Sequence, residues 1–100
     1  MFSISDTLNG GLEEVKLIGR LDVKAAKEAD ASFEEITAKG HDIVLNLSEL
    51  EYISSAGLRS LKRLHVSTRN NGISLTIKNV QYDVMEIFEM TGFAAMFKFA

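Results

Sequence analysis

The chain has 100 residues, no cysteine, no proline and a formal net charge of −3. Hydrophobic residues make up 46% and charged residues 25%, which are the proportions of a folded globular domain. The lack of cysteine excludes disulfide scaffolds, thiolate metal sites and cysteine nucleophiles. No apolar run approaches the roughly 20 residues of a membrane span, and the N-terminus lacks the features of a signal peptide. We therefore expect a cytoplasmic single domain over residues 1–100, without membrane contact.

The charge is unevenly distributed along the chain. Residues 53–72 contain Arg59, Lys62, Arg63 and Arg69 and no acid, so this window carries +4 and leaves −7 on the rest. The negative total argues against binding of nucleic acid. The basic window indicates either a solvated helix face or a docking surface for an acidic partner.

The N-terminal part predicts a β-hairpin. Residues Ser3 to Leu8 alternate apolar and polar side chains around Ile4, as expected of a short edge strand. Asn9-Gly10-Gly11 is the strongest turn signal in the chain, because asparagine and glycine tolerate positive φ. A second strand is predicted over residues Leu12 to Ile18, with Val15, Leu17 and Leu21 at odd positions.

A helix and a buried strand follow. Apolar residues three or four apart predict a helix from Val23 to Lys39, with Asp22 as its N-cap and Gly40 as its stop. The apolar, β-branched run from Asp42 to Leu47 predicts a central strand buried on both faces. Residues Ser48 to Ile53 are interpreted as a short connection.

The C-terminal half predicts two more helices around a strand. A helix is expected from Ser55 to Asn70, a strand from Ile73 to Lys78, and a last helix from about Gln81 to Thr91. Asn79 is predicted to cap that last helix, Gly92 to close it, and the apolar residues 93–99 to pack back on the sheet. The order β-β-α-β-α-β-α predicts an α/β domain with a partly parallel sheet and an antiparallel first strand at its edge.

No constellation of residues predicts catalysis. His65 lies on the apolar stripe of its helix, His41 is expected at the surface, and neither has a carboxylate at metal-ligand spacing. The pairs Glu13-Glu14 and Glu34-Glu35 are interpreted as solvated faces. Phosphate-binding glycine loops and the nucleophile elbow are both missing from the sequence. We expect no enzyme activity, no metal and no cofactor.

The segment Ile53-Ser54-Ser55-Ala56-Gly57-Leu58 follows a strand and opens a helix. N-capping alone explains Ser54 or Ser55. N-capping does not explain Gly57, because a glycine inside the first turn destabilises a helix by about 1 kcal/mol relative to alanine. Its expected benefit is the close approach of another backbone or of a partner.

Three segments together resemble the family of anti-sigma-factor antagonists, the STAS domain family. They are residues 45–58 (LNLSELEYISSAGL), residues 19–22 (GRLD) and residues 88–93 (FEMTGF), which keep the family's order and spacing. The resemblance covers nearly the whole chain. It implies a single STAS domain with a mixed four- to five-stranded sheet and three to four helices packed against it.

The resemblance also implies a function. Such proteins bind an anti-sigma factor that is a serine kinase, which phosphorylates a hydroxyl at this helix start, and a serine phosphatase removes the phosphate. The usual acceptor directly precedes the glycine, where this chain has Ala56, so the expected acceptor is Ser55, with Ser54 as second choice. The expected partner-binding residues are Asp22, Ser54, Ser55, Ala56, Gly57, Leu58, Arg59, Lys62 and Arg63. We expect a monomer, or at most a weak dimer.

Two alternatives remain open at this point. Ala56 also suits a STAS scaffold or interaction subunit that is not phosphorylated and acts in another bacterial signalling complex. A small enzyme or nucleotide-binding domain is the third hypothesis, although no phosphate loop or nucleophile in the sequence favours it.

Overall fold

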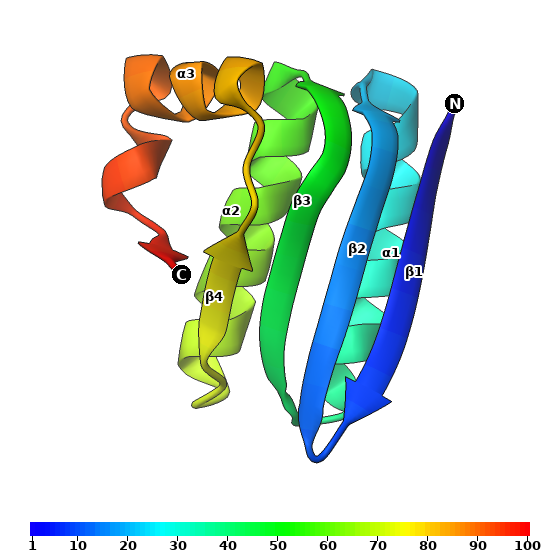
Figure 1. The fold of residues 1–100 in the computed structure, drawn as a ribbon. Coiled ribbons are helices and arrows are strands. Elements are labelled where there is room, and N and C mark those ends of the chain that lie inside the picture. Colours follow the sequence, from blue (N-terminus) through cyan, green and yellow to red (C-terminus); the bar gives the residue numbers. More distant parts are fainter.

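The computed structural model describes residues 1–100 as one sheet with helices packed against it (Figure 1). The elements in chain order are β1 (Phe2–Asn9), β2 (Leu12–Leu21), α1 (Val23–Ala38), β3 (Asp42–Ile53), α2 (Ser55–Asn70), β4 (Leu75–Lys78), α3 (Tyr82–Thr91), a 3-10 turn η1 (Phe93–Ala95) and β5 (Lys98–Phe99).

The sheet has five strands in the order β1-β2-β3-β4-β5. Strand β1 pairs with β2 antiparallel at one edge, and every other neighbouring pair is parallel. The predicted α/β architecture with an antiparallel edge strand is therefore confirmed. Helices α1 and α2 lie side by side on one face, and α3 lies across the end of β3 and β4 (Figure 1). The core lies between the sheet and these helices, and its largest side chains are Phe33, Phe88 and Phe97. None of the helices is long and apolar enough to cross a membrane.

Strand β3 is longer than predicted. We expected it to end at Leu47 and interpreted residues 48–53 as a connection, but the strand continues to Ile53. The pairing of β3 with β2 shifts register twice, once between Asn46 and Glu49 and once between Leu50 and Tyr52. Each shift is a bulge that places an extra residue in β3 and breaks the alternation by which a strand is recognised.

The connection from β4 to α3 also differs from the prediction. Strand β4 begins at Leu75, although Ile73 is buried as expected. Asn79 does not cap α3, because its φ of 59° places it in a left-handed turn and the N-cap position falls on Gln81. Gly92 ends the helix with φ of 81°, as predicted. The C-terminal segment packs back through Phe97, which is buried.

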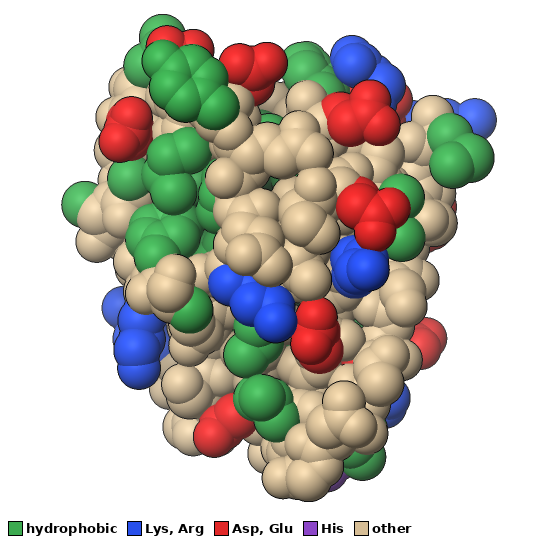
Figure 2. Space-filling model, in the orientation of Figure 1, with side chains coloured by type: hydrophobic (Ala, Val, Ile, Leu, Met, Phe, Trp, Pro, Cys, Tyr) green, Lys and Arg blue, Asp and Glu red, His purple; other side chains and the backbone are tan.

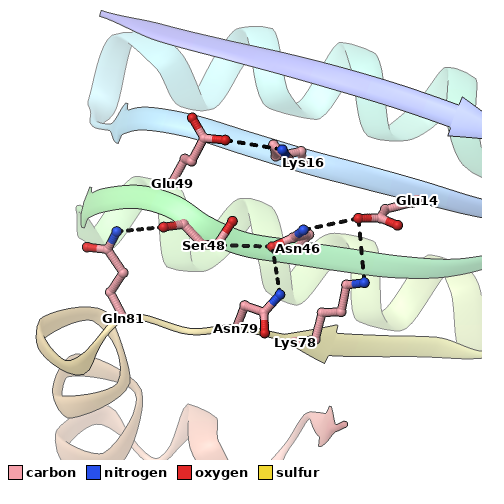
Figure 3. A network of polar contacts seen from close by, with 8 residues as sticks. All are labelled: Glu14, Lys16, Asn46, Ser48, Glu49, Lys78, Asn79 and Gln81. Atoms are coloured by element: carbon pink, nitrogen blue, oxygen red, sulfur yellow. Dashed lines mark hydrogen bonds and ion pairs between the residues drawn. The ribbon is translucent and has the colours of Figure 1, made fainter.

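A polar network covers the face of the sheet opposite α1 and α2 (Figure 3). The buried side chain of Asn46 donates to Glu14 Oε2 at 3.0 Å, and its Oδ1 accepts from the backbone N–H of Ser48 at 3.0 Å. Gln81 Nε2 donates to the carbonyl of Ser48 at 2.7 Å. These bonds fix the first bulge of β3 between its neighbours, and so they position the end of β3, where α2 begins. Around them, basic and acidic side chains lie close together on the surface (Figure 2).

Candidate functional site

Two helix N-termini lie side by side at the carboxyl end of β2 and β3. Leu21 and Ile53 are the last paired residues of these strands, and a helix starts directly after each. Asp22 caps α1, with its Oδ1 accepting from the N–H of Ala25 at 2.9 Å. The carbonyl of Leu21 accepts from the backbone N–H of Ser54 at 2.9 Å, which brings the two caps together. Asp22 therefore lies beside the start of α2, at the edge of the sheet where ligands of open α/β sheets gather.

The two serines at the start of α2 have different surroundings. Ser54 is half-buried and is the N-cap: its Oγ accepts from the N–H of Gly57 at 3.1 Å and donates to the carbonyl of Leu21 at 3.1 Å. Ser55 is exposed, and its hydroxyl makes no hydrogen bond within the chain. The hydroxyl of Ser54 thus both donates and accepts a hydrogen bond within the fold, whereas the exposed hydroxyl of Ser55 makes none.

Gly57 lets the start of α2 approach the end of β2. A Cβ at this position would lie 2.7 Å from the carbonyl oxygen of Leu21 and 2.9 Å from Ile53 Cγ1. The neighbouring backbone is thus the reason for the glycine. Gly57 and Leu58 are buried and support the turn from within the fold. Ala56 is half-buried at the surface of the turn.

Helix α2 presents three basic side chains directly after this turn. Arg59, Lys62 and Arg63 are all exposed. Arg59 and Lys62 form no ion pair, whereas Arg63 contacts Asp30 of α1 through two nitrogens, Nη2 at 2.6 Å and Nε at 3.4 Å. Asp30 was not predicted as a partner of the basic helix. The spacing gives no signal for it, because the two residues are 33 positions apart.

The opposite end of the sheet holds a charged cluster that was not predicted either. Glu13 was interpreted as part of a solvated face, but only 1% of it is exposed, and it lies 3.0 Å from His41 Nδ1. The interpretation of Glu13 is therefore wrong, whereas His41 is partly exposed and meets Glu13 from 28 positions away in the sequence. Lys39 Nζ lies 3.1 Å from Asp6 Oδ2 and 3.8 Å from Glu13 Oε1. His65 lies on the helix face expected of it and packs edge-on against Phe97.

Two pKa values are shifted in this cluster. Burial opposes the ionisation of Asp6, but hydrogen bonds with Glu13 and Lys39 outweigh it and hold the pKa of Asp6 below its ordinary value. The hydrogen bond and charge of Asp6 raise the pKa of Lys39. No group of three or more histidine or acidic side chains is arranged to hold a metal ion. Within the cluster, Glu13 Oε1 lies close to His41 and Lys39, whereas Glu13 Oε2 is buried without a hydrogen-bond partner.

The fold and this site define a small α/β domain with an exposed serine at a helix N-terminus. The STAS domain family matches residues 5–100. The chain therefore belongs to the STAS domain family, as the resemblance predicted.

Individual relatives agree with this assignment. A protein of Bordetella bronchiseptica, provisionally named anti-sigma factor antagonist BtrV, is 34% identical over 76 residues, which are 75% of this chain and 66% of that protein. The matched region thus spans just under two thirds of the relative's length.

Solved structures share the fold at low sequence identity. An anti-sigma factor antagonist from Mycobacterium paratuberculosis superposes with a TM-score of 0.89 at 17% identity, covering 99% of this chain and 85% of that chain. The phosphorylated form of SpoIIAA, a Bacillus cell fate determinant, superposes with a TM-score of 0.74 at 17% identity, covering 100% of this chain and 91% of that chain. At this level of sequence identity, the similarity to these structures establishes a shared fold.

Proposed function

We propose that this STAS domain is an anti-sigma-factor antagonist whose capture of an anti-sigma-factor serine kinase is switched off by phosphorylation of Ser55 and restored by a serine phosphatase. The observation that carries the proposal is the free, exposed hydroxyl of Ser55 beside the fully bonded hydroxyl of Ser54. The names of the relatives support the antagonist function. SpoIIAA has been solved in both phosphorylated and unphosphorylated forms, and this fold is therefore compatible with a phosphate.

A phosphate at Ser55 is expected to leave the domain folded. It adds about −1.5 to −2 charges at neutral pH. The start of α2 is the positive end of the helix dipole, which favours an anion there by about 0.3–1 kcal/mol. Because the Ser55 side chain makes no hydrogen bond within the chain, its modification removes no existing interaction. The effect of the phosphate therefore falls on partner binding rather than on stability.

Repulsion between the phosphate and an acidic group of the partner is expected to exceed this helix-dipole effect. Two unit charges of like sign about 4 Å apart, at an effective dielectric constant of 20, repel by about 4 kcal/mol. That corresponds to roughly a thousandfold loss of affinity. The proposed partner surface consists of Asp22, the turn from Ser54 to Leu58, and the exposed basic side chains of Arg59, Lys62 and Arg63 on α2.

Phosphate transfer tests this proposal directly. The purified protein is incubated with ATP and each histidine-kinase-like ATPase encoded beside its gene, and the phosphate is located by mass spectrometry. We expect phosphate on Ser55, no phosphate on Ser55→Ala, and phosphate still on Ser55 in Ser54→Ala once folding has been verified by circular dichroism. Phosphate on Ser54, or none on either serine, would contradict the assignment of Ser55.

A second candidate function is that of a scaffold subunit that is not phosphorylated. The observation that favours it is Ala56, which occupies the usual acceptor position of the family and has no hydroxyl. The two functions differ in their response to charge. The substitution Ser55→Asp weakens kinase binding strongly if the chain is a switch, and leaves partner binding unchanged if it is a scaffold.

A further inference from the structure

Strand β1 forms an open edge of the sheet. It is the first strand in the order of the sheet, so it has no neighbour on its outer side (Figure 1). It is eight residues long, from Phe2 to Asn9, and its pairing with β2 runs from end to end without a register shift. A long, uninterrupted edge strand with free backbone groups is a template for pairing with another strand.

The two edges of the sheet differ in how they are protected. The opposite edge, β5, has only the two residues Lys98 and Phe99, and both a short strand and a lysine hinder pairing at an edge. Strand β1 contains neither proline nor a basic residue. Its one charged side chain, Asp6, lies 3.1 Å from Lys39 Nζ of the same chain, which compensates its charge. Two copies of this edge can therefore approach each other without strong repulsion.

The even-numbered residues of β1 direct their backbone groups outward. At one end of the hairpin, the carbonyl of Met1 accepts from the N–H of Arg20 at 3.0 Å. At the other end, Gly10 and Gly11 both have positive φ, as in a two-residue turn whose flanking residues bond to each other. The bonding direction alternates along a strand, so the odd-numbered residues bond to β2. The residues whose N–H and C=O face away from β2 are then Phe2, Ile4, Asp6 and Leu8.

The side chains of these even-numbered residues lie on the face of the sheet that the helices cover, where Phe2 and Ile4 pack against the core. Leu8 shares this face but is 52% exposed. At the other end of β1, Phe2 and Met1 line a hollow of about 320 Å³ beside the start of α1, together with charged side chains. The edge thus has an exposed leucine at one end and a partly apolar hollow at the other.

We propose that β1 pairs with β1 of a second copy of this chain, antiparallel and with Ser5 on the two-fold axis, so that two sheets become one. In this register every residue from Phe2 to Leu8 has a partner, and all the outward backbone groups of the segment are bonded. Leu8 of each copy lies opposite Phe2 of the other, beside the hollow that Phe2 lines. The interface is a single pair of strands, so we expect the weak association of a small interface.

The neighbouring registers are less favourable. A shift by one step in one direction places Asp6 opposite Asp6 of the second copy, and like charges directly opposite each other destabilise a strand pair. A shift in the other direction leaves Leu8 beyond the end of the paired segment and shortens the overlap. The register with Ser5 on the axis instead places Asp6 opposite Ile4.

Cysteine cross-linking tests this register, because the chain has no cysteine of its own. The exposed residue Ser5 would face its own copy in a pair without hydrogen bonds, with Cα atoms about 4.5 Å apart, which suits a disulfide. We expect Ser5→Cys to give a covalent dimer on mild oxidation, seen on a non-reducing gel. Ser3→Cys is the matched control, because its two copies would lie four positions apart, roughly 13 Å, which is too far for a disulfide. Equal yields of dimer from the two variants, or none from Ser5→Cys, would overturn the proposal.

Charge substitution tests the dimer without oxidation. Ser5→Glu places like charges opposite each other on the axis, while within one chain the new carboxylate faces Lys16 of β2. Ser3→Glu adds the same charge away from the axis. In sedimentation velocity over a dilution series, we expect a concentration-dependent dimer of the wild type, and self-association about twofold to fivefold weaker for Ser5→Glu than for Ser3→Glu. Thermal unfolding verifies that both variants are folded. A wild type that stays monomeric at every concentration, or equal association of the two variants, would contradict pairing at Ser5.

Amide hydrogen exchange provides a control within the same chain. In the monomer the N–H groups of Ile4 and Asp6 face solvent, whereas those of Ser5 and Thr7 bond to β2. We expect exchange at Ile4 and Asp6, followed by NMR, to slow as the protein concentration rises, and exchange at Ser5 and Thr7 to be slow throughout. Exchange at Ile4 and Asp6 that does not depend on concentration would rule out β1 as the interface, even if the chain associates through another surface.

Discussion

The polar groups at the two ends of the sheet differ in whether they bond to one another or remain exposed to solvent. At the carboxyl end of β2 and β3, two helices begin, their caps are satisfied by local bonds, and the hydroxyl of Ser55 remains free in solvent. At the amino end, Asp6, Glu13, Lys39 and His41 bind one another around a carboxylate that is 1% exposed.

The direction of the helices explains this difference. The positive ends of the α1 and α2 dipoles converge at the carboxyl end, which suits an anion such as a phosphate. The negative end of α1 lies at the amino end, where Lys39 is the C-cap residue and supplies a cation. One end thus presents two helix N-termini beside an exposed hydroxyl, and the other pairs its acidic side chains with Lys39 and His41. If this contrast is correct, substitutions at the two ends have separable effects.

The largest expected effect is that of Gly57→Ala at the carboxyl end. Its Cβ would lie within 3 Å of Leu21 and Ile53 atoms, so α2 must move away from the end of β2. We expect a loss of about 1–3 kcal/mol in the free energy of unfolding, measured with urea, even though alanine is the better helix former. Ala56→Gly, which introduces no clash, is the control and is expected to cost less than about 1 kcal/mol. A Gly57→Ala protein more stable than the wild type would show that α2 has room for the added methyl group.

His41→Ala tests the amino end. The substitution removes the partner 3.0 Å from Glu13 Oε1, and Glu13 Oε2 already has no partner. We expect a loss of about 1–2 kcal/mol, because a buried carboxylate is left less well bonded. Chemical denaturation measures the loss, and phosphate transfer to Ser55 is expected to continue at the wild-type rate.

A double variant sharpens that experiment. Replacing Glu13 by leucine together with His41→Ala removes both polar partners, and the double variant is expected to regain part of the lost stability. If the double variant is less stable than His41→Ala alone, the cluster contributes more than the satisfaction of Glu13.

A smaller effect separates the two serines. Ser54→Ala removes the cap of α2 and the bond to the carbonyl of Leu21, and is expected to cost about 1 kcal/mol. Ser55→Ala removes no hydrogen bond and is expected to change stability by less than about 0.5 kcal/mol. Thermal and urea unfolding of the matched pair measure the difference. Equal losses would mean that Ser55 has a structural role as well.

Some of the features that distinguish the two ends of the sheet could be predicted from the sequence. Helix α2 has the predicted bounds, because its cap, apolar stripe and terminal Asn-Gly signals all agree. The end of strand β3 could not be predicted from the sequence, because bulges depend on the pairing with β2 and leave no local pattern in the sequence. Glu13 shows a different error. The odd-numbered register that places Val15, Leu17 and Leu21 inward also places Glu13 inward, but its charge favoured a solvated interpretation.

The sequence predicted the position of the candidate site but did not decide between its two serines. The sequence locates two serines at a helix start, but only the structure shows which hydroxyl is used by the cap. Ion pairs between residues far apart in sequence, such as Asp30 with Arg63 and His41 with Glu13, follow from how the elements pack, and no local spacing encodes them.

The smallest expected effect is the pH dependence contributed by Asp6. Because its pKa in the folded protein lies below the ordinary value of 3.8, the folded state binds this proton less readily than the unfolded chain does. The stabilisation is therefore complete well above pH 3.8 and is lost as the pH falls through that value toward the folded pKa. Asp6→Asn is expected to flatten the fall in unfolding free energy between about pH 6 and pH 3, by less than about 0.5 kcal/mol because the pair with Lys39 is partly exposed. Urea unfolding at a series of pH values measures the slope, and Glu51→Gln, an exposed residue of β3 without an ion pair, is the control. Parallel slopes for Asp6→Asn and the wild type would mean that the amino end is not held together by this ionised carboxylate, and the contrast between the two ends would then rest on Glu13 alone.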